Sequence, residues 1–99
     1  MENELTEYEK GLIKAWCKLD SAWGALNKTY NFYNVLAGKT KELERQLICI
    51  KQARTVIGVQ REIIMQWLKY IDYDEFVEHL MYDLKIKWNS LKNDWEVEL

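Results

Sequence analysis

Residues 5–37 read LTEYEKGLIKAWCKLDSAWGALNKTYNFYNVLA, and their apolar positions repeat with the spacing of a helix that buries one broad face. One position recurs every seven residues, at Leu5, Leu12, Leu19, Leu26 and Tyr33. The positions three and four residues further on are also mostly apolar or small and include Trp16 and Trp23. Thr6 fits the start of a capping box, and Gly38 fits a C-terminal cap. The pattern predicts a helix over residues 6–37.

The length of this helix limits the shape of the molecule. A straight helix over 6–37 spans ~48 Å, whereas a compact domain of this size has a radius of gyration near ~13 Å. The helix therefore either bends, around Gly24 or the 27–34 stretch, or belongs to an elongated molecule that can form a homodimer. Ala15 and Ala22 are small enough to let a partner helix approach closely.

Two further helices follow. Thr40 can cap a second helix, whose apolar stripe includes Leu43 and Leu47 and resumes after Gly58. We expect one helix over 40–71, either straight or kinked at Gly58, and antiparallel to the first because the link is short. Asp72 or Asp74 then caps a third helix over 73–82.

The last segment, LKIKWNSLKNDWEVEL, fits two structures. A helix can be drawn through it, but strict alternation over 84–88 and 95–99 fits strands better and places the apolar residues on one face. One register makes every cross-strand partner favourable. In that register the pairs are Trp88 with Trp95, Lys87 with Glu96, Ile86 with Val97, Lys85 with Glu98, and Leu84 with Leu99. We expect a β-hairpin with strands 84–88 and 95–99, packed on the face that carries Trp16 and Trp23 because a lone hairpin is marginal in water.

The predicted fold class is α+β, mainly α, in a single domain over 1–99. It consists of a long antiparallel helical hairpin, a short third helix and a C-terminal two-stranded β-hairpin. Hydrophobic residues make up 48% of the sequence and charged residues 30%, which is typical of a globular chain rather than a disordered one.

Charge and cysteine content narrow the class of protein. The net charge of −2 gives no sequence-wide reason to expect nucleic acid or anionic lipid as a partner. The segment 39–69, however, carries seven basic residues against three acids. Cys17 and Cys49 have no metal-binding spacing, and Cys17 falls opposite the apolar stripe, where we expect it to be exposed. The absence of a signal sequence and of a long apolar run favours an intracellular protein with no membrane span.

No group of residues builds an active site. His79 has acids at helical spacing, Glu75 and Asp83, but no second histidine or cysteine at ligand spacing. GKT at 38–40 lacks the earlier glycine of a phosphate-binding loop and is better explained as a helix cap. We therefore expect no catalytic residues, no metal and no cofactor.

The candidate interaction surface consists of aromatic and basic residues. Five Trp and six Tyr are many for this length, and exposed aromatic rings are typical of binding surfaces. The candidates are Trp16, Trp23, Lys51, Arg54, Arg61, Trp88 and Trp95. Arg54 and Arg61 lie seven residues apart on the second helix, where they either pair with acids on the facing helix or, with Lys51, bind phosphate or an acidic partner.

The chain resembles the small accessory proteins of archaeal filamentous viruses, of the lipothrixvirus or rudivirus type. The resemblance lies in a short sequence without proline, rich in Lys, Glu, Trp, Tyr and Ile, and especially in Trp16, Trp23 and the Lys/Glu arms of 84–99. It implies an unusual fold, a thermostable and acid-stable chain, and no assigned activity. A bacteriophage protein would share this character, so the resemblance assigns no functional residue.

Together these features predict a non-enzymatic viral accessory protein that acts through protein–protein interaction in the host cytoplasm, with a homodimer as a further option. The alternative is a nucleic-acid-binding protein that uses the basic 39–69 segment.

Overall fold

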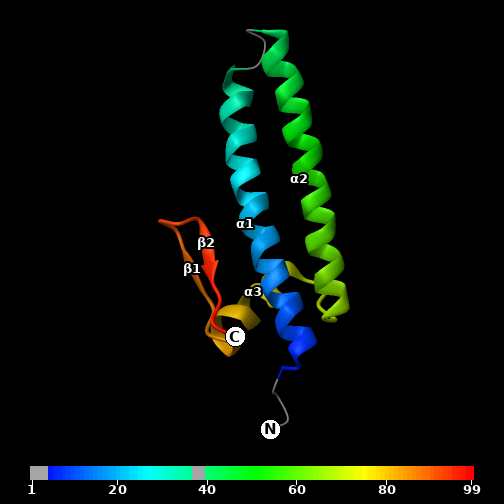
Figure 1. The fold of residues 1–99 in the computed structure, drawn as a ribbon, viewed down its shortest axis with the longest axis vertical. Helices are drawn as coiled ribbons and strands as arrows, with labels where there is room; N and C mark the ends of the chain where they lie inside the picture. The colour runs from blue at the N-terminus through cyan, green and yellow to red at the C-terminus, as the bar shows by residue number, and fades with distance from the viewer. Residues whose placement is uncertain (1–4, 37–39) are drawn as a thin grey trace.

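The computed structural model describes residues 5–36 and 40–99 and shows a mainly α fold with a small β-hairpin (Figure 1). Helices α1 (Glu7–Leu36) and α2 (Lys41–Trp67) form a long hairpin. The chain continues through α3 (Tyr73–Glu78), the π-helix η1 (His79–Asp83) and the antiparallel strands β1 (Lys87–Asn89) and β2 (Asp94–Glu96). The predicted fold class and the order of its elements are confirmed.

The long helices begin where their capping residues predict. The Thr6 N–H donates to Glu9 Oε1 and the Glu9 N–H donates to Thr6 Oγ1, both at 3.1 Å, which completes the capping box. Thr40 Oγ1 accepts from the Leu43 N–H, also at 3.1 Å. The predicted last residue of the first helix, Ala37, and its predicted cap, Gly38, lie outside the described residues.

The molecule is elongated. Its extents are 58 × 27 × 20 Å and its radius of gyration is 16.1 Å, larger than the ~13 Å of a compact domain of this length. Helix α1 is unbroken through Gly24 and the 27–34 stretch. Of the two alternatives that the helix length allowed, the elongated molecule is therefore correct.

Helix α2 ends at Trp67, four residues before the predicted boundary at 71. Lys69 has a φ of 67°, its N–H donates to the Gln66 carbonyl at 2.9 Å, and the Tyr70 N–H donates to the Met65 carbonyl at 2.9 Å. This pair of bonds is a Schellman motif, which ordinarily has glycine at the left-handed position. The sequence has no glycine at this position to mark the end of the helix. The apolar spacing alone therefore predicted a helix that is too long at its C-terminal end.

Gly58 lies within α2, which continues through it without the predicted alternative of a break. A Cβ atom at this position would lie 3.3 Å from Nε1 of Trp23. The missing side chain therefore allows the Trp23 ring of α1 to approach the α2 backbone closely.

The third helix starts as predicted but ends differently. Asp72 caps it by accepting a hydrogen bond from the Asp74 N–H at 3.1 Å. From His79 onward the helix is a π-helix, and it ends at Asp83 rather than at residue 82. Lys85, with a φ of 58°, turns the chain so that the Ile86 N–H donates to the Leu80 carbonyl at 2.9 Å.

The β-hairpin has the predicted register and shorter strands. Trp88 lies opposite Trp95 and Lys87 opposite Glu96. The predicted outer pairs, Ile86 with Val97, Lys85 with Glu98, and Leu84 with Leu99, are not part of the ladder. The reason is that the Ile86 N–H is already bonded to the preceding helix and Lys85 has a left-handed conformation. Strand β1 therefore begins only at Lys87, and β2 ends at Glu96.

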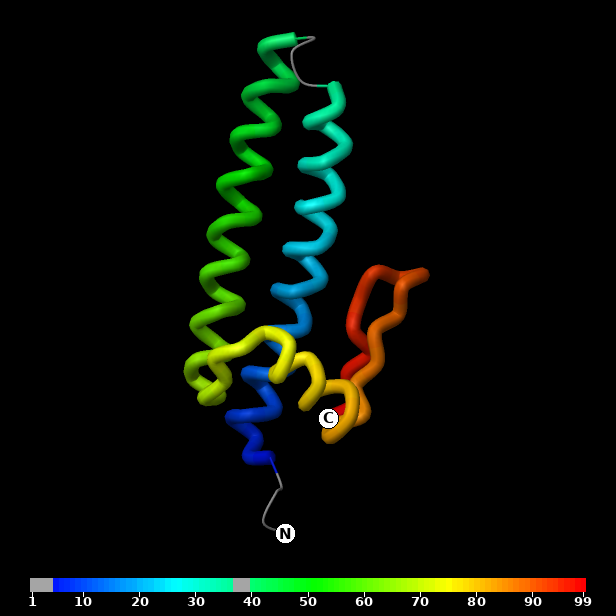
Figure 2. Tube along the Cα trace, turned by 180° about the vertical axis from the view of Figure 1, so that it is seen from behind, coloured from blue at the N-terminus to red at the C-terminus, as the bar shows by residue number. Residues whose placement is uncertain are grey.

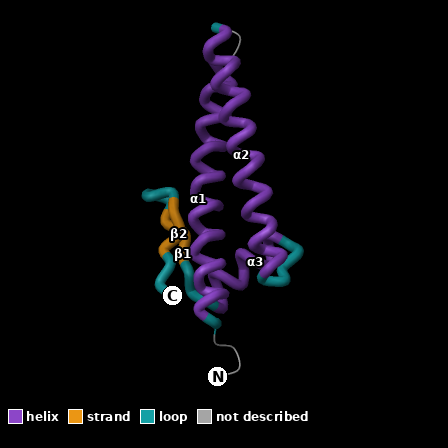
Figure 3. Tube along the Cα trace, turned by 45° about the vertical axis from the view of Figure 1, so that its right-hand side comes forward, coloured by secondary structure: helices purple, strands orange, loops and turns teal. Residues whose placement is uncertain are grey.

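The hairpin packs against α1, as predicted, so that α1 lies between the hairpin and α2 (Figures 1 and 3). The Trp95 ring lies 6.1 Å from the Trp16 ring. Ser21 Oγ donates to Asp94 Oδ1 at 2.6 Å, and this bond lowers the pKa of the Asp94 carboxyl. Viewed from behind, α3 crosses the lower part of α1 and closes the same end of the molecule (Figure 2).

The hydrophobic core therefore lies at this end of the molecule. It includes residues of α1 that lie outside the predicted apolar stripe. The core includes Ile13 and Cys17 of α1, which the stripe omitted, whereas Ala15 of the stripe is exposed. Cys17 is 2% exposed, so its predicted exposure is wrong. Its position beside Trp95 and Val97 explains the error, because β2 covers a second side of α1 that a helical pattern alone does not reveal.

The two thiols are expected to differ in reactivity. Burial, and then the nearby Asp20 and Asp94 carboxylates, raise the pKa of Cys17 from 9.0 to about 12, whereas Cys49 is exposed. At pH 8 a thiol reagent such as Ellman's reagent should label Cys49 at once and Cys17 only as the protein unfolds. Because the folded pKa is raised, the stability linked to this thiol is complete below pH 9 and is lost as the pH rises toward 12. Equal labelling rates for both thiols in the native protein would contradict the buried position of Cys17.

Candidate functional site

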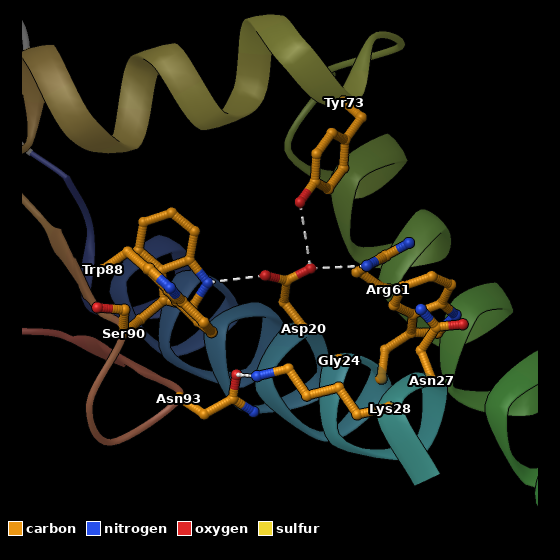
Figure 4. Close-up of a pocket in the computed structure, with 11 residues that line it drawn as sticks. Asp20, Gly24, Asn27, Lys28, Arg61, Tyr73, Trp88, Ser90 and Asn93 are labelled. Carbon is orange, nitrogen blue, oxygen red and sulfur yellow. Dashed lines mark hydrogen bonds and ion pairs between the residues drawn. The ribbon is translucent and has the colours of Figure 1, made fainter. Parts of the chain in front are cut away.

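A cleft of about 480 Å³ opens between the helical hairpin and the β-hairpin (Figure 4). Helix α1 forms its floor, Arg61 of α2 and Tyr73 of α3 form one side, and the β-hairpin forms the other. Its residues are Asp20, Trp23, Gly24, Asn27, Lys28, Arg61, Tyr73, Trp88, Ser90, Asn93 and Trp95. The cleft is thus built from elements that lie far apart in the sequence.

The Asp20 carboxylate joins the walls of the cleft. Its Oδ1 accepts from Arg61 Nη1 at 2.6 Å and from the Tyr73 hydroxyl at 3.4 Å. Its Oδ2 accepts from the indole Nε1 of Trp95 at 2.8 Å. A buried carboxylate is costly unless it is paired and hydrogen-bonded. Asp20 meets this requirement with one partner each from α2, α3 and β2, and so fixes the positions of these elements around α1.

Arg61 is held between aromatic rings. Its guanidinium carbon lies 4.9 Å from the centre of the Trp23 ring and 5.2 Å from that of Tyr73. The guanidinium group therefore combines an ion pair to Asp20 with two cation–π contacts. The position of Arg61 is consequently fixed before any ligand binds.

The open side of the cleft is formed by the β-hairpin and by Lys28. The Trp88 ring packs edge to face on Trp95 at 5.3 Å and is 38% exposed, whereas Trp95 is 8% exposed. Lys28 Nζ donates to Asn93 Oδ1 at 3.0 Å. A ligand entering the cleft would meet the Trp88 ring, an ammonium group and the polar side chains of Asn93 and Ser90.

The charged residues that line the cleft have a net charge of +1. Arg61 neutralises Asp20, which leaves Lys28 as the unbalanced charge among the lining residues. Burial raises the pKa of Tyr73, and the Asp20 carboxylate raises it further, so the phenol stays protonated and donates to Asp20 at neutral pH. The cleft thus presents aromatic faces and one cation.

The structure brings together most, but not all, of the candidate interaction residues. Trp23, Arg61, Trp88 and Trp95 line the cleft, and Trp16 is fully buried behind it against Trp95. Arg54 lies outside it, with Nη1 donating to Asn27 Oδ1 at 2.7 Å and its guanidinium 4.4 Å from the Tyr30 ring centre. Lys51 is exposed on α2, also outside the cleft. The two arginines thus form structural contacts, Arg61 with an acid of the facing helix and Arg54 with an amide.

Several lining residues were not predicted from the sequence, namely Asp20, Gly24, Asn27, Lys28, Tyr73, Ser90 and Asn93. Most belong to residue types that occur on any helix surface or turn, and the sequence contains no motif that joins them. Asp20 is different, because it is the only acid between Glu9 and Glu42 and is therefore the one acidic partner for a buried arginine on α1 beyond the first turn of that helix.

His79 lies in a second, smaller hollow of about 390 Å³ at the α3–η1 end. Its Nδ1 lies 2.8 Å from Asp83 Oδ2, and its ring stacks on Tyr70 at 5.4 Å. Among residues 5–36 and 40–99, no three His, Cys, Asp or Glu side chains are grouped so that they could hold a metal ion. Nor is any helix within these ranges both long enough and apolar enough to span a bilayer.

Comparison of the chain with protein-family models, with curated proteins and with solved structures found no match.

Proposed function

We propose that this chain is a non-enzymatic binding protein whose cleft holds a short segment of a protein partner. The observation that carries the proposal is the open aromatic cleft, in which exposed Trp88 stands beside a largely pre-formed floor and wall. Ligand pockets are typically concave, mostly apolar and fixed by a few polar groups. The same proposal includes a role as a viral accessory factor in the host cytoplasm. The support for that part is the general character of the sequence.

The chemistry of the cleft defines the partner segment. The Trp88, Trp95 and Trp23 rings favour an apolar or aromatic side chain as the anchor. Lys28 favours a carboxylate next to that anchor, because it is the unbalanced charge of the lining. Asp20 supports a binding role over a catalytic one, since both of its oxygens already accept hydrogen bonds within the protein.

The alternative, nucleic-acid binding through the basic 39–69 segment, receives less support. Of the group Lys51, Arg54 and Arg61, the two arginines are engaged in intramolecular contacts and Lys51 alone is exposed. Within the described part of the segment, the other exposed basic residues are Lys41, Arg45 and Lys69. Gel shifts with single-stranded and duplex DNA and RNA at about 50 and about 200 mM salt test this alternative, because phosphate binding weakens steeply with salt. Salt-sensitive binding that is lost on Lys51→Ala would favour it over the cleft.

Selection of binding peptides from a random display library tests the cleft directly. The variant Gly24→Gln is designed to block the cleft. Gly24 lies on the floor of the cleft, and a Cβ there would meet nothing within 4 Å. The glutamine side chain should therefore occupy part of the cleft and obstruct it, while the loss of a helical glycine stabilises α1 by roughly 0.5–1 kcal/mol. Gly11→Gln is the matched control, because Gly11 is also an unobstructed glycine of α1 but lies outside the cleft.

We expect the native protein to enrich peptides with an aromatic or aliphatic anchor beside Asp or Glu. These peptides should bind Gly11→Gln as well as the native chain and Gly24→Gln at least about tenfold more weakly, which corresponds to about 1.4 kcal/mol of binding free energy. Equal binding to both variants, or turnover of a substrate that depends on Asp20, would overturn the proposal.

A further inference from the structure

No other described element covers the outer face of α2 (Figures 1 and 2), and this face carries a stripe of exposed apolar residues that Gln52 interrupts. The stripe consists of Ile48, Val56, Val59 and Ile63, each 38% to 57% exposed. Their spacings of eight, three and four residues return to the same side of a helix. The more buried stripe, which includes Ile57, Arg61 and Ile64, is offset from it by about half a turn, and its Arg61 contacts Asp20 of α1. Helix α2 therefore has two apolar faces, of which the fold uses one.

We propose that the outer face of α2 is the surface on which a second copy of this chain docks, with the two α2 helices antiparallel about a twofold axis near Val56. A twofold interface brings each surface patch against itself, so residue i meets residue j of the partner and residue j meets residue i. The ends of the stripe satisfy this symmetry, because Ile48 and Ile63 lie at nearly equal distances on either side of Val56, and the same axis places Val59 opposite Gln52 of the copy. In the pairing, Ile48 packs near Ile63 of the copy and the two Val56 side chains meet at the axis.

The charges beside the stripe support the same axis. Lys51 and Glu62 are eleven residues apart, which is about three helical turns, so they project from one flank of the stripe. Their midpoint also falls beside Val56. The antiparallel arrangement therefore places Lys51 of each copy opposite Glu62 of the other and forms two symmetric ion pairs. Both residues are exposed, and neither has an ion-pair partner within the described part of its own chain.

The size of the face indicates a weak and reversible dimer. A 27-residue helix is ~40 Å long and ~10 Å wide, which gives a projected strip of roughly 400 Å² on each copy. Together the two copies would bury roughly 800 Å², which is below the ~1,200 Å² of stable interfaces and in the range of weak, transient contacts. The cleft is lined from α2 only by Arg61, which lies on the face opposite the stripe, so the dimer leaves both clefts open and can bind two partner segments at once.

Sedimentation equilibrium of the full chain over a wide concentration range tests the dimer, and charge exchange tests its geometry. We expect a reversible monomer–dimer equilibrium with a dissociation constant in the micromolar range. Lys51→Glu should weaken association about tenfold, because it turns two attractive pairs into repulsive ones. Glu62→Lys should have the same effect, and the double variant Lys51→Glu/Glu62→Lys should restore association.

Val56→Glu should abolish the dimer, because it brings two carboxylates together at the axis. Val56 is 56% exposed, so the variant should keep its helical circular dichroism. If that variant loses its fold, the charge-exchange series alone decides. A native chain that stays monomeric at millimolar concentration, or a double charge variant that associates no better than either single one, would overturn the proposal. A dimer that forms equally well with Val56→Glu folded would also overturn it.

Discussion

Replacement of Trp16 by alanine is expected to lower the free energy of unfolding by about 3–5 kcal/mol, the usual cost of removing a fully buried Trp or Phe side chain. Trp16 is 0% exposed, and its ring lies 4.7 Å from Phe76, 5.9 Å from Tyr73 and 6.1 Å from Trp95. It therefore joins α1 to both α3 and the β-hairpin. Urea unfolding followed by far-ultraviolet circular dichroism measures the change. Small domains have total stabilities of about 5–15 kcal/mol, so the variant should be close to unfolding at 37 °C.

The matched control is Trp67→Ala, which removes the same side chain from a position that is 59% exposed. This variant should lose less than about 1 kcal/mol. Equal losses for the two variants would mean that Trp16 does not join α3 and the hairpin to α1.

Replacement of Asp20 by alanine is expected to cost about 3–5 kcal/mol, because it leaves the buried Arg61 guanidinium without its counter-charge. The indole N–H of Trp95 loses its acceptor at the same time. For a domain of this size such a loss lowers the melting temperature by at least about 12 °C. Thermal unfolding followed by circular dichroism measures it.

The double variant Asp20→Ala/Arg61→Met distinguishes the pairing from the packing of Asp20. Removal of both charges should be less costly than removal of Asp20 alone, because no unpaired charge remains buried. A double variant that is less stable than Asp20→Ala would show that the ion pair is not the main contribution of these residues.

The register of the β-hairpin could be predicted from the sequence because charge and apolar patterns agreed in one alignment. Lys87 opposite Glu96 and Trp88 opposite Trp95 followed from that agreement alone. The helix starts at Thr6 and Thr40 were also predictable, since side chains that cap a helix are local signals.

The ends of α2 and of the last helix could not be predicted in this way. Each helix is followed, two residues after its last one, by a lysine in the left-handed conformation, Lys69 or Lys85, where glycine is the usual signal. Tertiary packing favours these conformations, as Tyr70 lies on Phe76 at 5.1 Å and Ile86 is buried. A prediction from periodicity alone therefore placed the end of α2 at residue 71, too late, and the start of β1 at residue 84, too early.

The tryptophans and Arg61 of the cleft were predictable from the sequence, whereas Tyr73 and the other polar residues were not. The surplus of tryptophan indicated a surface on which Trp23, Trp88 and Trp95 contribute, and the structure brings these three together. Asp20 could have been inferred only by asking which acid of the first helix was available to Arg61. The involvement of Tyr73 depends on how α3 crosses α1, which no local pattern specifies.

The most direct test of the binding cleft is a nuclear magnetic resonance titration of the five tryptophan indole N–H signals with a peptide from the display selection. The cleft account predicts that the signals of Trp23, Trp88 and Trp95 shift together and saturate at one stoichiometric equivalent. The signal of Trp67, exposed on α2 away from the cleft, should stay in place. A shift confined to Trp67, or saturation without any change at Trp88, would contradict the cleft as the site of binding.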